Sequence, residues 1–224
     1  GEAPRAPVIN TPSADDTTIG GATGAAIAYT ITVTTFPISY VQYKLDKINS
    51  SNAVTDAGQF TGSLPGTSGS NSTTLSTRIT STGSTESLIY DQKYALYLRS
   101  VDGSGQIGPE SLVRRFTTSN EVAPTAVAPT LTSTSVSYPT APFISITWAA
   151  GTAGTYAIAT RQYSVVAGTG AAGTFTTASG TTGTVSPTTT AAGVAILPNT
   201  QYTVYMKYIA TSPGVTSATA SATI

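Results

Sequence analysis

The sequence predicts an all-β protein built from two similar domains in tandem. A stretch from Leu88 to Val101 recurs from Ile196 to Ile209, aligned without a gap at a spacing of 108 residues. In both copies apolar residues return at every second position, which is typical of a half-buried strand. Short alternating segments separated by Gly and Pro turns fill the rest, without helical periodicity. A repeat of this length indicates two domains rather than a solenoid.

The first domain is expected at residues 8–118, after an extended N-terminal arm at residues 1–7 that contains Pro4 and Pro7. A broken first strand is expected over residues 8–19, interrupted at Pro12. Further strands are predicted at residues 27–36, 39–47, 93–102 and 111–118, with short strands near 59–62 and 73–80.

A Pro-containing linker at residues 119–129 is predicted to precede the second domain at residues 130–224. About seven short strands are expected in each domain. In the second they lie near residues 131–137, 143–149, 157–167, 174–177, 184–196, 201–211 and 216–224.

A second echo supports the pairing of the domains. Gln42-Tyr43-Lys44-Leu45 matches Gln162-Tyr163-Ser164-Val165, and each Tyr precedes the Tyr of the repeated strand, by 51 residues in the first domain and 39 in the second. The 12 additional residues fall in a Ser-, Thr- and Gly-rich stretch at residues 49–86. An enlarged loop or added edge strands are therefore expected in the first domain.

Both domains resemble fibronectin type III and related immunoglobulin-like modules. The run from Ile196 to Val204 is similar to the tyrosine-corner pattern L-x-P-x-T-x-Y-x-V of that family, and Ile144-Ser145-Ile146-Thr147-Trp148 resembles its second strand. Residues Tyr94 to Ser111 resemble its last two strands. The resemblance implies two seven-stranded β-sandwiches, with Tyr94 and Tyr202 as corner residues and Trp148 in a core. The first domain departs from the pattern because it lacks that Trp and the corner Pro.

Composition argues against several functional classes. The chain has 224 residues, no Cys and no His, so it lacks disulfides, thiolate metal sites and the commonest general base. Its net charge is zero, and it shows no basic field for nucleic acid and no apolar run long enough to span a membrane. No nucleophile–base pair or metal-ligand set is recognisable. We therefore expect a protein that is not an enzyme and needs no cofactor or metal.

Charge is distributed unevenly along the chain. Nine of the ten carboxylates lie between Glu2 and Glu110, and the tenth is Glu121. From Thr125 to Ile224 there is no acidic residue, and Arg161 and Lys207 are the only charged side chains. A nearly uncharged surface favours association over dispersion in solution.

The strand phase suggests an interface at equivalent outward positions in the two domains. Tyr97 and Arg99 alternate with the apolar face of the first repeated strand, as Tyr205 and Lys207 do in the second. Exposed aromatics beside long cations suit an interface, and ordinary cross-strand packing explains the same pattern equally well.

Two short motifs match the acceptor pattern for N-linked glycosylation. They begin at Asn49 and Asn71, and both lie in the polar stretch where a glycan could be accommodated.

These observations favour a structural subunit of an extracellular filament, pilus-like fibre or surface array. Its partner would be itself, as a homopolymer assembled through β-sandwich faces and through the arm, with covalent glycans on its surface. The alternative is a monomeric spacer, or an adhesive or carbohydrate-binding module, of a larger secreted or virion-fibre protein. Either function places the chain outside the cell, at a cell surface or on a virion.

Overall fold

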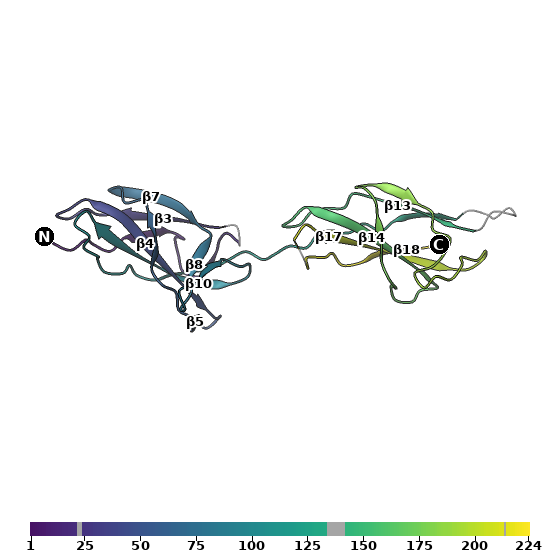
Figure 1. Cartoon of the computed structure of the whole chain (residues 1–224), viewed down its shortest axis with the longest axis horizontal. Coiled ribbons are helices and arrows are strands. Elements are labelled where there is room, and N and C mark those ends of the chain that lie inside the picture. Colours follow the sequence, from purple (N-terminus) through teal and green to yellow (C-terminus); the bar gives the residue numbers. More distant parts are fainter. Residues whose placement is uncertain (22–23, 134–141, 213) are drawn as a thin grey trace. The chain divides into compact units, whose positions relative to one another are not determined.

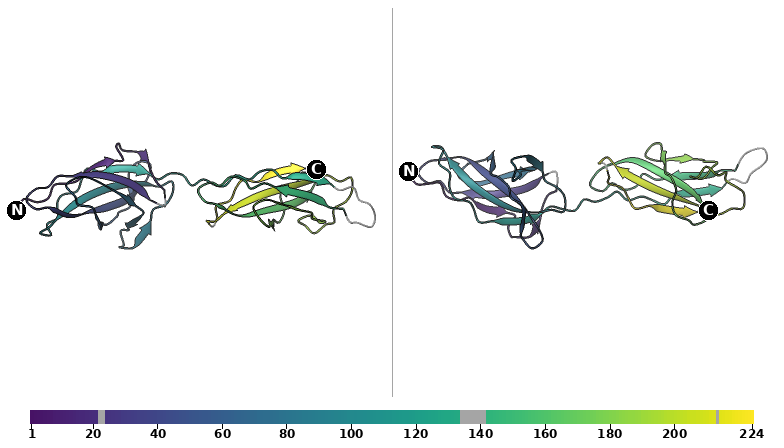
Figure 2. Two further views of the ribbon diagram at one scale, coloured as in Figure 1. Left: turned by 90° about the horizontal axis from the view of Figure 1, so that it is seen from above. Right: turned by 60° about the horizontal axis from the view of Figure 1, so that its bottom comes forward.

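The computed structural model describes residues 1–21, 24–133, 142–212 and 214–224. These residues form strands, turns and loops, and no helix occurs among them (Figures 1 and 2). The all-β prediction is therefore confirmed. The chain divides into two compact units, Gly1–Glu121 and Val122–Ile224.

The first unit contains two main sheets and a small hairpin. One sheet has the strand order β1-β3-β7, and the other β2-β11-β10-β4-β5, with β6 also paired to β4. β8 and β9 pair with each other as a separate hairpin, and Ile79 of β8 also bridges to Gln59. The strands are β1 (Val8–Thr11), β2 (Thr17–Thr18), β3 (Ala25–Ile31), β4 (Ile38–Ile48), β5 (Val54–Asp56), β6 (Thr61–Leu64), β7 (Gly69–Leu75), β8 (Thr77–Ile79), β9 (Thr85–Ser87), β10 (Lys93–Asp102) and β11 (Arg114–Thr117).

The two sheets of the first unit enclose one apolar core. Ile27 and Tyr29 of β3 face inward from one sheet, and Leu96 and Leu98 of β10 face inward from the other. All four are at most 2% exposed, as the alternation of the sequence predicts. The first unit has eleven strands where about seven were expected, because the stretch at residues 49–86 forms β5 to β9.

The second unit has two sheets with the orders β12-β13-β16 and β15-β14-β17-β18. Ile146 and Trp148 from the first sheet and Val204 and Met206 from the second share its core. In Figure 1, β13 lies in one layer and β14, β17 and β18 in the other. The strands are β12 (Thr130–Ser133), β13 (Ile144–Trp148), β14 (Ile158–Ala167), β15 (Thr176–Ala178), β16 (Gly183–Val185), β17 (Tyr202–Ala210) and β18 (Ala220–Thr223).

The repeated stretch forms the same corner in both units. The Tyr94 hydroxyl accepts a hydrogen bond from the Ile89 amide at 3.2 Å, and the Tyr202 hydroxyl accepts one from the Leu197 amide at 2.8 Å. A non-glycine residue with positive φ lies three positions before each Tyr, at Asp91 and Asn199. These residues turn the chain so that the buried hydroxyl reaches a backbone donor.

The N-terminal arm does not extend freely from the first unit. Pro4 and Pro7 are buried, and the Glu2 amide donates a hydrogen bond to the Thr35 hydroxyl at 3.0 Å. β1 follows directly and already pairs with β3 of the same chain. The segment that was expected to be an extended arm therefore packs on its own unit, where Pro4 and Pro7 are buried.

The predicted linker at residues 119–129 is shared between the units rather than free. The Ser119 amide donates to the Gly20 carbonyl at 2.7 Å within the first unit. Val122 exchanges hydrogen bonds with Thr155, and Thr125 pairs with Thr152, within the second unit. Hydrogen bonds thus attach Ser119 to the first unit and Val122 and Thr125 to the second, within a segment whose Pro content suggested a linker.

Candidate functional site

The predicted interface residues of the first unit lie on the outer face of β10 and make contacts within their own sheet. Lys44 of β4 lies opposite Tyr97, and its Nζ is 4.5 Å from the centroid of the Tyr97 ring. Arg99 donates from Nε to Gln42 Oε1 at 2.8 Å, and its Cζ is 4.0 Å from the centroid of Phe60. Tyr97 and Arg99 are half-buried, so they form a packed polar–aromatic surface on this sheet.

The second unit repeats this arrangement. Lys207 lies opposite Gln162, and its Nζ is 4.2 Å from the centroid of the Phe175 ring. The Tyr205 hydroxyl donates to the Gly170 carbonyl at 2.6 Å. Each unit therefore carries a Gln on β4 or β14, a cation opposite it on β10 or β17, and a Phe beneath that cation.

Sequence reasoning missed both phenylalanines. Phe60 immediately precedes β6 and Phe175 immediately precedes β15, and each is followed by Thr. This shared Phe-Thr pair at the start of a short edge strand is the signal that could have identified them. The outward phase of Tyr97, Arg99, Tyr205 and Lys207 was predicted, but the partner that covers each cation was not.

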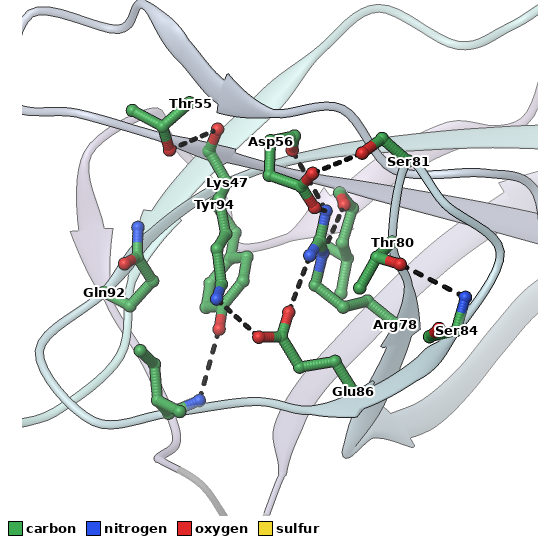
Figure 3. A network of polar contacts seen from close by, with 12 residues as sticks. Lys47, Thr55, Asp56, Arg78, Thr80, Ser81, Ser84, Glu86, Gln92 and Tyr94 are labelled. Atoms are coloured by element: carbon green, nitrogen blue, oxygen red, sulfur yellow. Dashed lines mark hydrogen bonds and ion pairs between the residues drawn. The ribbon is translucent and has the colours of Figure 1, made fainter.

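A buried ion-pair network in the first unit was also missed (Figure 3). The Arg78 side chain is fully buried, and it pairs through NH2 with Asp56 Oδ2 and through NH1 with Glu86 Oε2, both at 2.7 Å. Arg78 Nε also donates to the Leu45 carbonyl at 2.9 Å. Lys47 Nζ reaches the other oxygen of Glu86 at 2.7 Å. The guanidinium thus fastens β5 and the β8–β9 hairpin to β4.

The network holds its carboxylates ionised. Hydrogen bonds from Ser81 and Arg78 lower the pKa of Asp56, and hydrogen bonds from Lys47 and Arg78 lower the pKa of Glu86. Carboxylates stabilised in this way are poor proton donors near neutral pH. The arrangement therefore suits a structural role rather than general acid catalysis.

Among the residues that the structure describes, no group of three or more acidic, His or Cys side chains could hold a metal ion. The Asp102 turn illustrates the difference between a turn and a metal loop. Asp102 Oδ1 accepts hydrogen bonds from the Ser104 and Gln106 amides, both at 2.9 Å. These bonds use the carboxylate to close the turn between β10 and β11.

No helix in the described residues is long and apolar enough to cross a membrane.

The two predicted glycosylation sites differ in accessibility. Asn49 is exposed, and its Oδ1 accepts hydrogen bonds from the Ser51 and Ala53 amides, so the turn uses this oxygen rather than Nδ2. Asn71 lies on β7 and donates from Nδ2 to the Thr67 carbonyl at 2.6 Å and to the Gly69 carbonyl at 3.2 Å. Attachment of a glycan to Asn71 would replace one of the two Nδ2 hydrogens and so remove at least one of these bonds.

Comparison with known proteins yields no family. No protein-family model matches the chain, and no curated protein matches it. Among solved structures, an α-L-rhamnosidase from Dictyoglumus thermophilum aligns with 8% identity and a TM-score of 0.33. An α-L-rhamnosidase from Streptomyces avermitilis, complexed with L-rhamnose, aligns with 10% identity and a TM-score of 0.32. The alignments cover 100% and 99% of this chain but only 30% and 24% of those enzymes.

Proposed function

We propose that this chain is a structural subunit that assembles with copies of itself into an extracellular filament, fibre or surface array. The observation that carries the proposal is the charge state of the second unit. Its two charged side chains are both engaged internally. Arg161 is 8% exposed and donates from Nε and NH2 to the Ala150 carbonyl, while Lys207 lies over Phe175. The surface of this unit is therefore almost without free charge.

The edges of the second unit's sheets add support. β12, β15, β16 and β18 occupy the four edges, and their sequences, Thr-Leu-Thr-Ser, Thr-Thr-Ala, Gly-Thr-Val and Ala-Ser-Ala-Thr, contain neither a charged residue nor a proline. Soluble monomers commonly place Lys or Pro at such edges to prevent strand pairing between molecules. A subunit whose edges are covered by neighbours does not need that protection.

The architecture that we propose for the building block is a tandem of immunoglobulin-like modules. The supporting observations are the two corner hydroxyls and the three-plus-four strand arrangement of the second unit. Modules of this kind serve many functions, so this assignment bears on shape and not on activity.

The proposal is tested by adding charge to the edges. Thr177 of β15 and Ser221 of β18 are exposed, so Lys at either position would be solvated in a monomer. We expect Thr177→Lys combined with Ser221→Lys to abolish assembly in light scattering at a concentration where the natural chain assembles. Thr181→Lys combined with Thr182→Lys, in the exposed turn between β15 and β16, adds the same two charges away from the edges and should preserve assembly. Equal assembly by all variants would refute edge-mediated association.

The second candidate function is a monomeric spacer or adhesive module of a larger secreted or virion-fibre protein. It is favoured by the internal contacts of the predicted interface residues, since Lys44 covers Tyr97 and the Tyr205 hydroxyl is bonded to Gly170. Tyr97→Glu and Tyr205→Glu separate the two functions. Assembly through the sheet faces predicts that either change blocks association, whereas a spacer would remain monomeric with or without them.

A further inference from the structure

The second unit contains a hollow of ≈ 310 Å³ between β14 and the segment that joins β16 to β17. Tyr163 lines it from β14, Thr174 from just before β15, Thr176 from the start of β15, and Pro187, Thr189 and Ala191 from the joining segment. Its volume is at the lower end of the range for small-molecule sites.

The walls of the hollow are fixed by hydrogen bonds and close packing. The Ala191 amide donates to the Val165 carbonyl at 2.8 Å, and the Gly173 amide donates to the Ser164 hydroxyl at 3.0 Å. A Cβ at Gly173 would lie 2.9 Å from the Ala191 side chain, so the segments on either side are in contact there. The hollow is therefore formed before any ligand binds.

The first unit shows why the second one has this hollow. Tyr43 occupies the position equivalent to Tyr163, but it is 7% exposed and its hydroxyl donates to the Thr77 carbonyl at 2.7 Å. A Cβ at Gly62, in β6, would lie 2.9 Å from the Tyr43 ring. β6, the counterpart of β15, and the additional strand β8 thus cover Tyr43.

The second unit has β15 in the place of β6 but no counterpart of β8 among its described residues, because β16 is followed directly by β17. Tyr163 packs against the core and is only half-buried. Its hydroxyl makes no hydrogen bond with any residue that the structure describes, and partial burial raises its pKa. A polar group at this position gains from a bound hydrogen-bonding partner.

The chemistry of the lining is neutral and rich in hydroxyl groups. Phe175 lies under Lys207 on the outer face, so strand alternation directs its neighbours Thr174 and Thr176 toward the hollow. Each Thr hydroxyl can both donate and accept a hydrogen bond. No charged residue lines the hollow, so an ionic ligand would lose hydration without gaining a counter-charge.

We propose that this hollow binds a neutral saccharide unit. A pyranose ring offers apolar faces to the Tyr163 ring and to Pro187, and hydroxyl groups to Tyr163, Thr176 and Thr189. A purely apolar ligand would leave those protein hydroxyls unpaired, which costs binding free energy. This proposal rests on the side chains of the hollow and not on the proposed assembly, although Thr176 belongs to the edge strand β15.

The test is a titration of the ¹⁵N-labelled full chain with the methyl glycosides of glucose, galactose and mannose, followed by amide chemical shifts. At least one glycoside should shift the Gly173 and Ala191 amides saturably, with a Kd of about 1 mM or weaker. Tyr163→Phe should weaken that binding about three- to tenfold by removing one hydrogen bond. Thr189→Leu, which fills the hollow, should abolish it. The matched control is Tyr43→Phe, which should leave the Kd unchanged.

The saccharide could be free or carried by the protein itself, so untreated and enzymatically deglycosylated chains are titrated side by side. Equal responses assign a free saccharide, whereas a response only after deglycosylation assigns a glycan of the protein. The proposal is overturned if no glycoside shifts these amides in either sample. It is also overturned if Tyr163→Phe and Thr189→Leu, with native Trp148 fluorescence as proof of folding, bind as the natural chain does.

Discussion

Arg161 lies against Tyr208 in the second unit, with its guanidinium carbon 5.4 Å from the centroid of the Tyr208 ring. Both side chains are bonded to the same turn. The Tyr208 hydroxyl donates to the Ala149 carbonyl at 2.5 Å, and Arg161 donates twice to the Ala150 carbonyl. This pair explains why one of the unit's two cations is hidden from solvent.

The turn held by this pair requires glycine at position 151. Gly151 has a φ of +78°, and a Cβ there would lie 2.2 Å from the Tyr208 ring. We expect Gly151→Ala to lower the free energy of unfolding by about 1–3 kcal/mol more than Gly168→Ala. Gly168 also has positive φ, at +67°, but has open space around its Cβ, so it isolates the backbone cost. Urea unfolding followed by Trp148 fluorescence measures both losses. Equal losses would show that the Tyr208 ring moves aside without cost, and would contradict a steric requirement for glycine at position 151.

The Arg78 network should dominate the stability of the first unit. Arg78→Met removes a buried guanidinium and leaves the Leu45 carbonyl without its partner, while the two carboxylates remain partly hydrated. We expect a loss of about 2–4 kcal/mol in the free energy of unfolding. Lys44→Met removes a surface ion pair in which Lys44 Nζ lies 3.8 Å from Glu110 Oε1, and this change should cost less than about 1 kcal/mol. Hydrogen exchange of β4 amides measures both, and similar losses would contradict a structural role for Arg78.

Acid should destabilise the first unit selectively. The pKa values of Asp56 and Glu86 are lowered in the folded chain from ordinary values of 3.8 and 4.5. Groups with depressed pKa values stabilise the fold above those ordinary values, and this stabilisation is lost as the pH falls further. The second unit has no acidic side chain, so its stability should remain level through the same range.

The single Trp of the chain separates the two units in this experiment. Trp148 lies in the core of the second unit, so its fluorescence reports that unit alone, whereas circular dichroism reports both. In urea melts at decreasing pH below about 4.5, the transition seen only by circular dichroism should move to lower urea. The fluorescence transition should stay in place. A parallel shift of both transitions would contradict the assignment of the acid response to Asp56 and Glu86.

Glycan attachment, if present, should distinguish the two asparagines. Asn49 is exposed, and its turn is held by Oδ1 rather than Nδ2. Asn71 lies on the edge strand β7, and its Nδ2 donates to the Thr67 and Gly69 carbonyls. In intact-mass measurements of the native chain, we expect Asn49→Gln to remove the excess mass and Asn71→Gln to leave it unchanged. The reverse result would show that β7 opens before it is modified.

The sequence predicted the elements that obey simple periodicity. The alternation around Tyr94 and Tyr202 placed two strands and their buried faces, and the equivalence of Tyr43 and Tyr163 located a second strand in each unit. Period two also gave the outward direction of Tyr97 and Tyr205 correctly. These features depend on residues close together in the chain.

Contacts between distant segments could not be predicted in the same way. Arg78 stands in a short polar strand, where nothing local distinguishes a buried cation from a solvated one. Its burial depends on Asp56 and Glu86, which belong to other strands. Likewise, the roles of Phe60 and Phe175 depend on their contacts with Arg99 and Lys207, which come from distant strands. The packing of the N-terminal arm could not be predicted for the same reason, because its proline content indicates an extended chain but not the residues that the chain contacts.

The most direct test of the account is electron microscopy of the native, unfractionated protein, combined with the intact mass of the chain. A self-assembling subunit predicts regular fibres or lattices built from a 22.6 kDa chain, with any additional mass due to glycans. Dispersed monomers at high protein concentration would contradict assembly. The chain would then be a tandem spacer whose second unit has a nearly uncharged surface.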